Sequence, residues 1–385
     1  MVASEVVDAL RNSPCGRHLL DAAARLDDVW LVGGAPRDIL LGRTPLELDV
    51  AVEGEIGPLV ELLGGTAQEY ERFGTATVQA GACRFDLART RSERYAEPGA
   101  LPDVEPAPID RDLARRDVSV NAIAVRLPDG ELRSAPGAMA DLRAGVLRVL
   151  HDQSLRDDPT RLWRIARYSA RLGFTVEPQT AELARVAGPG AVSGERFGYE
   201  LRLALAEDDP CLVFERVAEL NPLALPEGFV PRPAGLTEAL ALLPSDGRRD
   251  LLVLAACCAG MELELLVRWL DHLQWNAEDR DVVAASSRWV TGAPLRGASG
   301  PAAIARAARG APIEAVALAG GDNARRWIDE LRAVRLEIGG DDLIAAGVPQ
   351  GPDLGARLQR ALDAKLEGRA SGRDAELAVA LGDEG

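Results

Sequence analysis

The segment 29–54, VWLVGGAPRDILLGRTPLELDVAVEG, constrains the fold of this 385-residue chain more than any other. It begins with a short apolar run that ends in two glycines, which predicts a buried strand and a tight turn into a helix. A second strand-like run follows, in which Glu47 and Asp49 are two residues apart, so both carboxylates project from the same face. This order of elements indicates an α+β domain at the start of the chain.

The same segment contains residue types that bind phosphate and metal. Gly33 and Gly34 let the backbone approach a ligand closely, and the amides of the helix that follows, together with Arg37, can hold a phosphate. Two carboxylates on one strand face can hold Mg²⁺ ions that bridge a triphosphate and an attacking hydroxyl. Asp86 lies in a predicted hairpin over 76–89 and could be a third carboxylate of this group.

Strand patterns disappear after residue 141, where amphipathic helices alternate with breaks rich in glycine and proline. One of these helices is predicted over 157–174, DDPTRLWRIARYSARLGF. Apolar side chains occupy one arc of it, and the opposite arc of about 120° contains Arg161, Arg164, Arg167 and Arg171. Like charges on one face destabilise a helix but suit an anion. We therefore expect this face to bind a phosphate-bearing ligand.

Charge is unevenly distributed along the chain. The totals are 44 basic and 60 acidic residues, a net charge of −16, which by itself argues against a nucleic-acid partner. Residues 143–171, however, hold seven arginines against three aspartates, while residues 206–385 hold 19 basic and 29 acidic residues. Every basic residue except Lys365 is arginine, whose planar fork suits phosphates and base edges. A basic belt therefore lies where the head meets the helical region.

The cysteines and the apolar runs bear on the cellular compartment in which the protein is expected. Five cysteines without a CxxC pair predict a reduced, cytosolic protein and offer no zinc site. The start, MVASEVVDAL, does not have the pattern of a signal peptide. The longest apolar run, 251–261, is about half of the ~20 residues that a membrane span needs. We therefore expect a cytoplasmic protein without a membrane partner.

Seven ordered motifs resemble the class II tRNA nucleotidyltransferase and bacterial poly(A) polymerase family. The first is the glycine–acid segment described above. The others are, in order, RFGTATVQ (72–79) with FDLARTRSERYAEPGALPDVEP (85–106), DLARRDVSVNAIAV (112–125), GAMADLRAGVLR (137–148), DDPTRLWRIARYSARLGF (157–174), SGERFGYEL (193–201) and GGDDLIAAGVPQGPDLGARLQRALDAKLEG (339–368).

The resemblance implies a polymerase β-like nucleotidyltransferase head with a mixed sheet, followed by an elongated all-α region. The divisions that it implies are a catalytic head over 1–140, a neck that selects the base over 141–205, a body over 206–290, and a tail that binds tRNA over 291–385.

The resemblance also implies roles for single residues. In relatives, the residues that match Asp158 and Arg161 pair with the edge of the incoming base, where a carboxylate can accept from the exocyclic amine of cytosine or adenine. Arg164 and Arg167 would reach the triphosphate. The sugar and phosphates would be contacted by Arg115, Arg116, Asp117 and Asn121.

The activity implied is template-independent addition of C and A residues to the 3′ end of tRNA, from CTP and ATP, with release of pyrophosphate. Glu47 and Asp49, with Asp86 as a third catalytic carboxylate, would hold two Mg²⁺ ions. The helical region would bind the acceptor and TΨC arm through its shape and backbone. The sequence makes no prediction of the oligomeric state.

Glu47 departs from the family pattern, which usually has aspartate at both acidic positions. Its extra methylene shifts the metal-binding oxygen, so a weakened enzyme or an RNA-binding relative without activity is an alternative. Asp157 and Val118 are smaller departures, at positions where glutamate and phenylalanine are common. Within the family, an A-adding enzyme, a CC-adding enzyme and a poly(A) polymerase remain alternatives, because no residue of the sequence decides between them.

Overall fold

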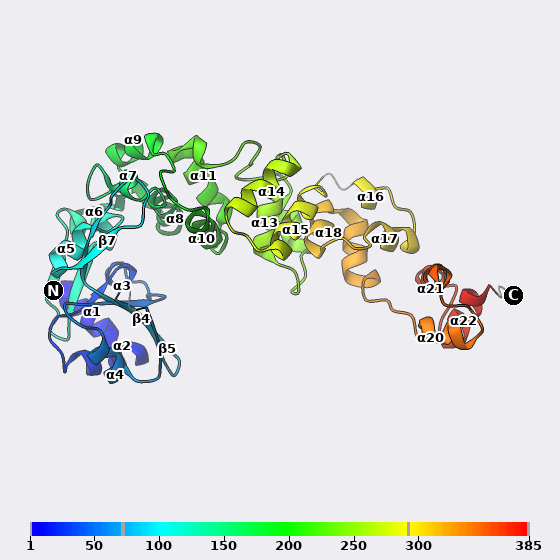
Figure 1. Ribbon diagram of the computed structural model, residues 1–385, viewed down its shortest axis with the longest axis horizontal. Helices are drawn as coiled ribbons and strands as arrows, with labels where there is room; N and C mark the ends of the chain where they lie inside the picture. The colour runs from blue at the N-terminus through cyan, green and yellow to red at the C-terminus, as the bar shows by residue number, and fades with distance from the viewer. Residues whose placement is uncertain (1, 71–73, 291–292, 383–385) are drawn as a thin grey trace. The chain divides into compact units, whose positions relative to one another are not determined.

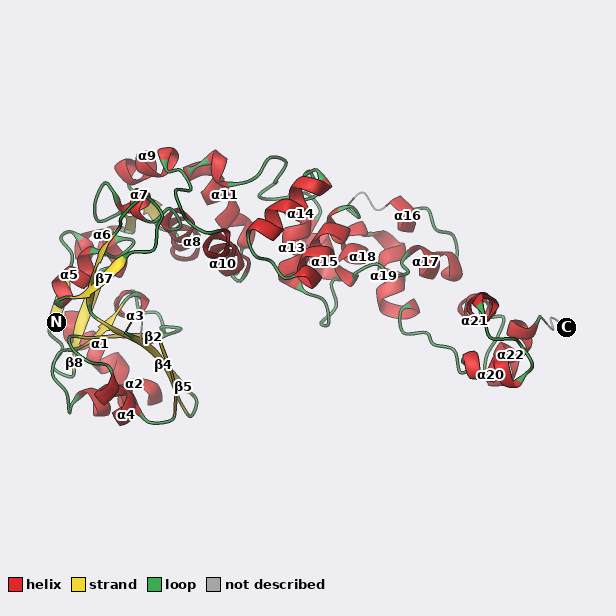
Figure 2. Cartoon of the chain, viewed as in Figure 1, coloured by secondary structure: helices red, strands yellow, loops and turns green. Residues whose placement is uncertain are grey.

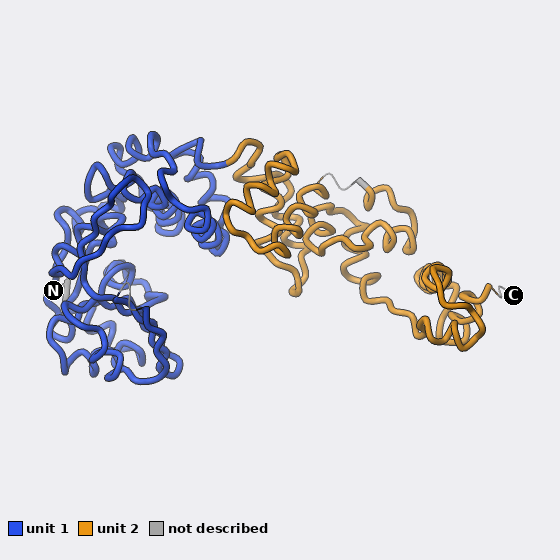
Figure 3. The backbone as a smooth tube through the Cα atoms, viewed as in Figure 1, with its two compact units in different colours: residues 1–225 blue, residues 226–385 orange. Residues whose placement is uncertain are grey.

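The computed structural model describes residues 2–70, 74–290 and 293–382. Arg72 and Phe73, which begin the motif RFGTATVQ, lie outside the described residues. The chain forms two compact units, Met1–Leu225 and Pro226–Gly385, coloured separately in Figure 3. The four-part division into head, neck, body and tail is finer than these units and stays a prediction.

A seven-stranded mixed sheet forms the centre of the head, with the strand order β3-β4-β5-β2-β1-β8-β9. Two of its strands, β4 and β5, are labelled in Figure 1. The pairing of β2 with β5 is parallel, and the other neighbouring pairs are antiparallel. The strands are β1 Val29–Val32, β2 Leu48–Val52, β3 Thr66–Tyr70, β4 Thr75–Ala80, β5 Cys83–Arg89, β8 Ile123–Leu127 and β9 Leu132–Ser134. The predicted strands and the hairpin are confirmed.

Alternation along β2 separates the core from the site. Leu48, Val50 and Val52 belong to a buried apolar cluster that includes fully buried residues of the helices α1 Val2–Arg11, α2 Pro14–Ala23 and α4 Gly57–Leu63. Asp49, between them in sequence, therefore points to the opposite face of the sheet. Helix packing on one face thus leaves the other face for polar side chains.

Cys15 of α2 and Cys83 of β5 form a disulfide, which contradicts the expectation that the cysteines are reduced. The two residues are 68 positions apart in the sequence, so the absence of a CxxC pair could not reveal their contact. The packing of α2 against β5 brings them together. The three other cysteines, Cys211, Cys257 and Cys258, are buried and lie outside this disulfide.

Besides the sheet, unit 1 contains further helices and two small strand pairs. The antiparallel pair is β6 Arg91–Arg94 with β7 Asp103–Pro106, and the parallel pair is β10 Val146–Leu147 with β11 Thr175–Val176. The second pair corrects the expectation that no strands follow residue 141. The helices are α3 Gly34–Leu40, α5 Ile109–Ala114, the 3₁₀ turn η2 Ser119–Asn121, α6 Ala138–Ala144, α7 Ser154–Asp157, α8 Arg161–Leu172, α9 Pro178–Val186, α10 Gly194–Leu205, α11 Pro210–Leu220 and the 3₁₀ turn η3 Pro222–Ala224.

The predicted helix over 157–174 is two helices, α7 and α8. Asp158 between them has an extended backbone, with φ −137° and ψ 93°. The proline that follows explains the break, because the residue before a proline is disfavoured in the helical region. The helix α8 packs against α11, where the Trp163 and Phe214 rings meet edge to face at 6.4 Å.

The described part of unit 2 is helical, as Figure 2 shows by colour. Its helices are α12 Leu236–Leu242, α13 Arg249–Cys257, α14 Leu263–His272, α15 Ala277–Ser287, α16 Ala293–Arg296, α17 Pro301–Ala307, α18 Ile313–Ala319, α19 Gly321–Arg326, the π-helical turn η4 Trp327–Leu331, α20 Gly340–Ala345, α21 Pro352–Leu366 and α22 Arg373–Leu381. None of the helices in the described residues has both the length and the apolar character that a membrane crossing requires. A mixed-sheet head followed by helices confirms the predicted fold class.

Candidate active site

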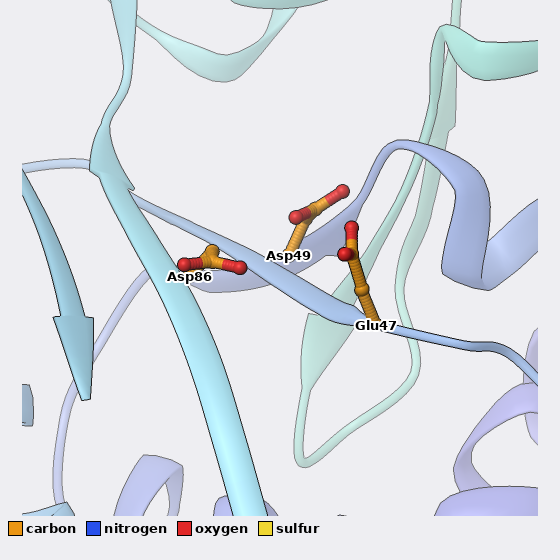
Figure 4. Close-up of side chains that lie close together, drawn as sticks. All are labelled: Glu47, Asp49 and Asp86. Carbon is orange, nitrogen blue, oxygen red and sulfur yellow. The ribbon is translucent and has the colours of Figure 1, made fainter. Parts of the chain in front are cut away.

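Three carboxylates gather on the open face of the sheet. Glu47 immediately precedes β2, Asp49 lies within it, and Asp86 lies opposite Asp49 on the parallel strand β5. One oxygen from each of the three lies within 4.8 Å of the others. Figure 4 shows the three side chains close together. The sequence-predicted grouping of these acids is therefore present in the fold.

Asp49 is electrostatically strained in this group. Burial raises the pKa of Asp49 to about 6, and repulsion from Glu47 adds to the increase, while Arg116 opposes it. Asp86 accepts hydrogen bonds from Thr77 Oγ1 at 2.6 Å and from Arg84 at 3.2 Å. Oxygen donors in a cluster of like charge fit a hard divalent cation such as Mg²⁺, since a cation would relieve the repulsion.

Gly33 allows the turn from β1 to approach the acids. Its φ is +72°, and a Cβ at this position would lie 2.8 Å from Asp49 Oδ2 and 3.5 Å from Arg116 Nη1. A side chain would therefore collide with the carboxylate and strain the backbone. The helix α3 begins at Gly34, slightly before the predicted start near Pro36.

A cavity of about 380 Å³ lies beside the acids within unit 1. It is lined by ten of the predicted site residues, namely Gly33, Gly34, Asp49, Arg115, Arg116, Asp117, Asn121, Asp158, Arg161 and Arg164. Glu47, Asp86, Arg37 and Arg167 are not among its lining residues. Its walls combine arginines with carboxylates, which suits a ligand that carries both phosphates and a polar base.

Arg37 and Arg167 are buried away from this cavity. Arg37 donates from Nη1 to Asn121 Oδ1 at 2.6 Å and lies over the Tyr168 ring at 5.6 Å from its centroid. Arg167 pairs with Glu200 and with Glu207, both at 3.5 Å. Each of these two arginines thus contacts protein groups rather than the cavity, and their predicted contacts with phosphate stay predictions.

The arginines of α8 do not form the open basic face expected from the helical arc. Arg161 is only 5% exposed and Arg167 only 7%. Arg171 pairs with Glu207. Acids that are distant in the sequence, on α10 and just after it, neutralise one end of the arc, and the binding of a phosphate-bearing ligand by this face stays a prediction.

Asp117 connects several residues of the cavity wall. Its Oδ2 accepts from Arg164 Nε at 2.8 Å and from the Tyr168 hydroxyl at 3.0 Å, while its Oδ1 accepts from Asn121 Nδ2 at 3.1 Å. Burial alone would raise the pKa of Asp117, but the charge and hydrogen bonds of Arg164 outweigh it and hold the pKa well below its usual range. Asp117 is therefore ionised and fixes Arg164 and Asn121 in place.

Asp158 and Arg161 line the cavity with polar groups of opposite kind. Asp158 Oδ1 accepts from the backbone N–H of Thr160 at 3.1 Å, from its hydroxyl at 2.7 Å and from Arg196 Nη2 at 2.8 Å. Arg161 donates to Ser154 Oγ at 2.6 Å and to the Arg115 carbonyl at 2.7 Å. Protein contacts hold both side chains in place. The cavity wall therefore has a preorganised acceptor and a preorganised donor, three residues apart in the sequence.

A second group of lining residues, on and after β6, was not predicted from the sequence. Glu93 accepts from Arg115 Nη1 at 2.7 Å, from Arg91 Nη2 at 3.1 Å and from the Tyr95 hydroxyl at 2.9 Å. The alternation of Arg91, Glu93 and Tyr95 in RSERY could have indicated a shared face. Arg196 and Tyr168 also line the cavity, and their placement depends on helix packing that has no local sequence pattern.

Comparison with known proteins agrees with this geometry. Residues 29–148 match the poly(A) polymerase head domain. An A-adding tRNA nucleotidyltransferase of Halalkalibacterium halodurans is 36% identical over 240 residues, which cover 57% of this chain and 56% of that protein. A second A-adding enzyme, of Geobacter sulfurreducens, is 30% identical over 92% of this chain and 45% of its own length. A CC-adding enzyme of Deinococcus radiodurans is 42% identical over 48% of this chain and 51% of its own length.

The chain thus spans about half the length of these curated relatives. Among solved structures, a CCA-adding enzyme in complex with CTP superposes with a TM-score of 0.78 and 25% identity, covering 100% of this chain and 99% of that one. The fold of the chain therefore agrees with the fold of this neighbour. Residues 29–148 thus match the poly(A) polymerase head domain, and the chain as a whole is similar to class II tRNA nucleotidyltransferases and bacterial poly(A) polymerases.

Proposed function

We propose that this protein is a template-independent tRNA nucleotidyltransferase that adds C and A residues to tRNA 3′ ends from CTP and ATP. One observation carries the proposal: a single cavity is lined by Asp49 of the acid group and by the base-reading pair Asp158 and Arg161. A site for phosphate chemistry and a site for base selection are thus adjacent. The cytoplasmic location stays a prediction.

In the proposed reaction, the 3′-oxygen of the RNA bonds to the α-phosphorus of the nucleotide. The bond from that phosphorus to the bridging oxygen breaks, pyrophosphate leaves with the electron pair, and the hydroxyl proton is released to solvent. Glu47, Asp49 and Asp86 would hold two Mg²⁺ ions, which lower the pKa of the hydroxyl and neutralise the phosphates when bound. Arg116, close to Asp49 and Gly33, would bind a phosphate oxygen.

Base selection would use the different donors and acceptors of the bases. Cytosine and adenine both present an exocyclic amine beside an unprotonated ring nitrogen, which match an acceptor on Asp158 and a donor on Arg161. Uracil and guanine present the opposite pattern on that edge. All three protein contacts of Asp158 named above are to Oδ1, which leaves Oδ2 to accept from the amine.

Addition of A alone is a second candidate, because two of the relatives described above are A-adding enzymes. The test uses three tRNA substrates, ending in the discriminator base, in C and in CC, each with Mg²⁺ and one labelled nucleotide. Addition to all three supports CCA synthesis, and addition of A to the CC end alone identifies an A-adding enzyme. The proposal would be overturned if the wild type, at saturating tRNA, incorporated no nucleotide into any of the three substrates.

The matched control for this assay is Asp49→Ala. It should abolish incorporation and leave tRNA binding unchanged, because Asp49 belongs to the acid group rather than to the helical region. Loss of tRNA binding in the variant would show that Asp49 has a structural role instead.

A further inference from the structure

Tyr199 is exposed, whereas most of the described aromatic residues are buried or half-buried. Among the described residues, the exposed aromatic side chains are Tyr199, at 59%, and Tyr70, at 49%. Tyr199 lies on α10, and Glu195 and Arg202 on the same helix are also exposed. The spacing i, i+4 and i+7 places these three residues on one face of the helix.

This face of α10 lines a second cavity in unit 1, of about 730 Å³. Leu101, in the loop between β6 and β7, also lines it and is 59% exposed. Asp158, Arg164 and Arg196 line both this cavity and the one beside the acids. The two cavities are therefore adjacent, and they share the carboxylate that is proposed to read the incoming base.

Tyr199 is also linked to the acid group through Arg84. Its phenol interacts electrostatically with Arg84, and Arg84 donates to Asp86 Oδ1 at 3.2 Å. Tyr199 thus lines the same cavity as the proposed base-reading carboxylate Asp158, and Arg84 connects it with one of the carboxylates proposed to bind metal. The group that must approach both places in the proposed reaction is the nucleotide that supplies the attacking 3′-oxygen.

The lining of the second cavity suits a base better than a phosphate. Its arginines are offset by the acids Asp158, Glu195 and Glu200, so a phosphate would meet carboxylates as well as cations. The exposed faces of Tyr199 and Leu101 are apolar and uncharged. A flat nucleobase can stack on such faces whatever its identity, and aromatic stacking is a common mode of binding for single-stranded RNA ends.

We propose that Tyr199 and Leu101 form a stacking platform for the 3′-terminal base of the RNA acceptor strand. This inference rests on the proposed function and deepens it, because it assigns the site of the attacking nucleotide. The platform binds the base that precedes the new one, so it determines affinity for the RNA end and leaves the choice of incoming nucleotide to Asp158 and Arg161.

The kinetic test compares Tyr199→Ala with Tyr199→Phe. Loss of a base–aromatic stack weakens binding by about 1–3 kcal/mol, which corresponds to roughly a 5- to 150-fold rise in the KM for tRNA. The KM for ATP and CTP should stay within about two-fold, and Tyr199→Phe should behave as the wild type because it keeps the ring. Val186→Ala, at a residue that is 79% exposed on α9, is the matched control and should change neither KM.

An RNA whose 3′-terminal nucleotide lacks its base identifies the group that stacks. On this substrate, Tyr199→Ala and the wild type should have equal KM values, because there is no base to lose. An equally large effect of the variant on the abasic RNA would overturn the proposal, and so would a rise in the nucleotide KM without a rise in the tRNA KM.

A binding measurement separates this inference from the proposed function. A tRNA with 2-aminopurine at its 3′ end should lose fluorescence on binding the wild type and Tyr199→Phe, and keep it on binding Tyr199→Ala. Quenching in a protein that incorporates no nucleotide would refute the enzyme and retain the platform. Equal quenching by all three proteins would refute the platform even if incorporation is normal.

Discussion

The substitution Asp49→Asn should stabilise the metal-free protein. The pKa of Asp49 is raised from 3.8 to about 6, first by burial and then by repulsion from Glu47. Because the folded state holds this proton more tightly than the unfolded chain does, wild-type stability falls as the pH rises from about 4 to about 6 and stays low above that range. An asparagine of the same shape removes the charge that causes this loss.

The magnitude follows from the size of the shift. About two pKa units at 1.36 kcal/mol each give an upper limit near 3 kcal/mol. Relaxation of the site and partial access of water reduce this value, so we expect a gain of about 1–3 kcal/mol at pH 7.5. Below about pH 4 the wild-type carboxyl is protonated, so the gain should disappear.

The assay must report on the head itself, because two compact units need not unfold together. Amide hydrogen exchange of peptides that span β1 and β2, measured in EDTA, provides this local free energy of opening. Addition of Mg²⁺ should stabilise the wild type and leave Asp49→Asn unchanged, since the substitution removes a ligand.

Asp129→Asn is the matched control in the same sheet. Asp129 lies in the exposed turn between β8 and β9, where its hydrogen bond from Arg126 lowers its pKa. The same substitution should therefore bring no gain at this position. The reasoning about Asp49 is refuted if Asp49→Asn is less stable than the wild type at pH 7.5 in EDTA, or if its gain persists undiminished below pH 4.

Four further predictions test other parts of the site. Arg161→Ala should reduce the preference for C and A over U and G by about 1–3 kcal/mol, measured as kcat/KM for each nucleotide, and an unchanged preference would contradict its role. Gly33→Ala should lower kcat at least about 100-fold with a folded head by circular dichroism, because the new Cβ would meet Asp49 at 2.8 Å; normal activity would show that the turn can shift. Asp117, whose pKa is depressed by Arg164, contributes stability that is lost as the pH falls below about 4, so Asp117→Asn should unfold with a weaker dependence on acid, and an identical acid transition would refute this. The affinity for tRNA should fall with salt by a slope of only a few units on logarithmic axes, whereas a slope near ten would imply many more phosphate contacts than the basic belt provides.

Local alternation in the sequence was enough to predict two of the three acids of the group. The period of two through residues 46–52 placed Glu47 and Asp49 on one face, whereas the parallel pairing that brings Asp86 beside them is a contact between distant segments. The same rule, applied to Arg91 and Glu93, would have found the carboxylate that holds Arg115. Groupings within one strand can be predicted from the sequence because the pleat puts alternate side chains on the same face of the sheet.

Contacts between distant segments were not predictable in this way. The helical arc placed Arg167 on one basic face with Arg164, but it could not show that Glu200, 33 residues later, pairs with Arg167. The disulfide between Cys15 and Cys83 has the same origin in tertiary packing. A helical wheel gives the direction of a side chain but not the charge of the element that packs against it.

The register between β2 and β5 makes the length of a distant turn part of the metal-binding site. Asp86 stands opposite Asp49 because β5 leaves its hairpin with β4 directly after Gly81 and Ala82. One inserted residue in that turn would shift β5 by one position, moving Asp86 to the buried face and the fully buried Phe85 to the site. Surface turns usually tolerate changes of length, but this turn is a spacer whose residue count is as constrained as the identity of the acids.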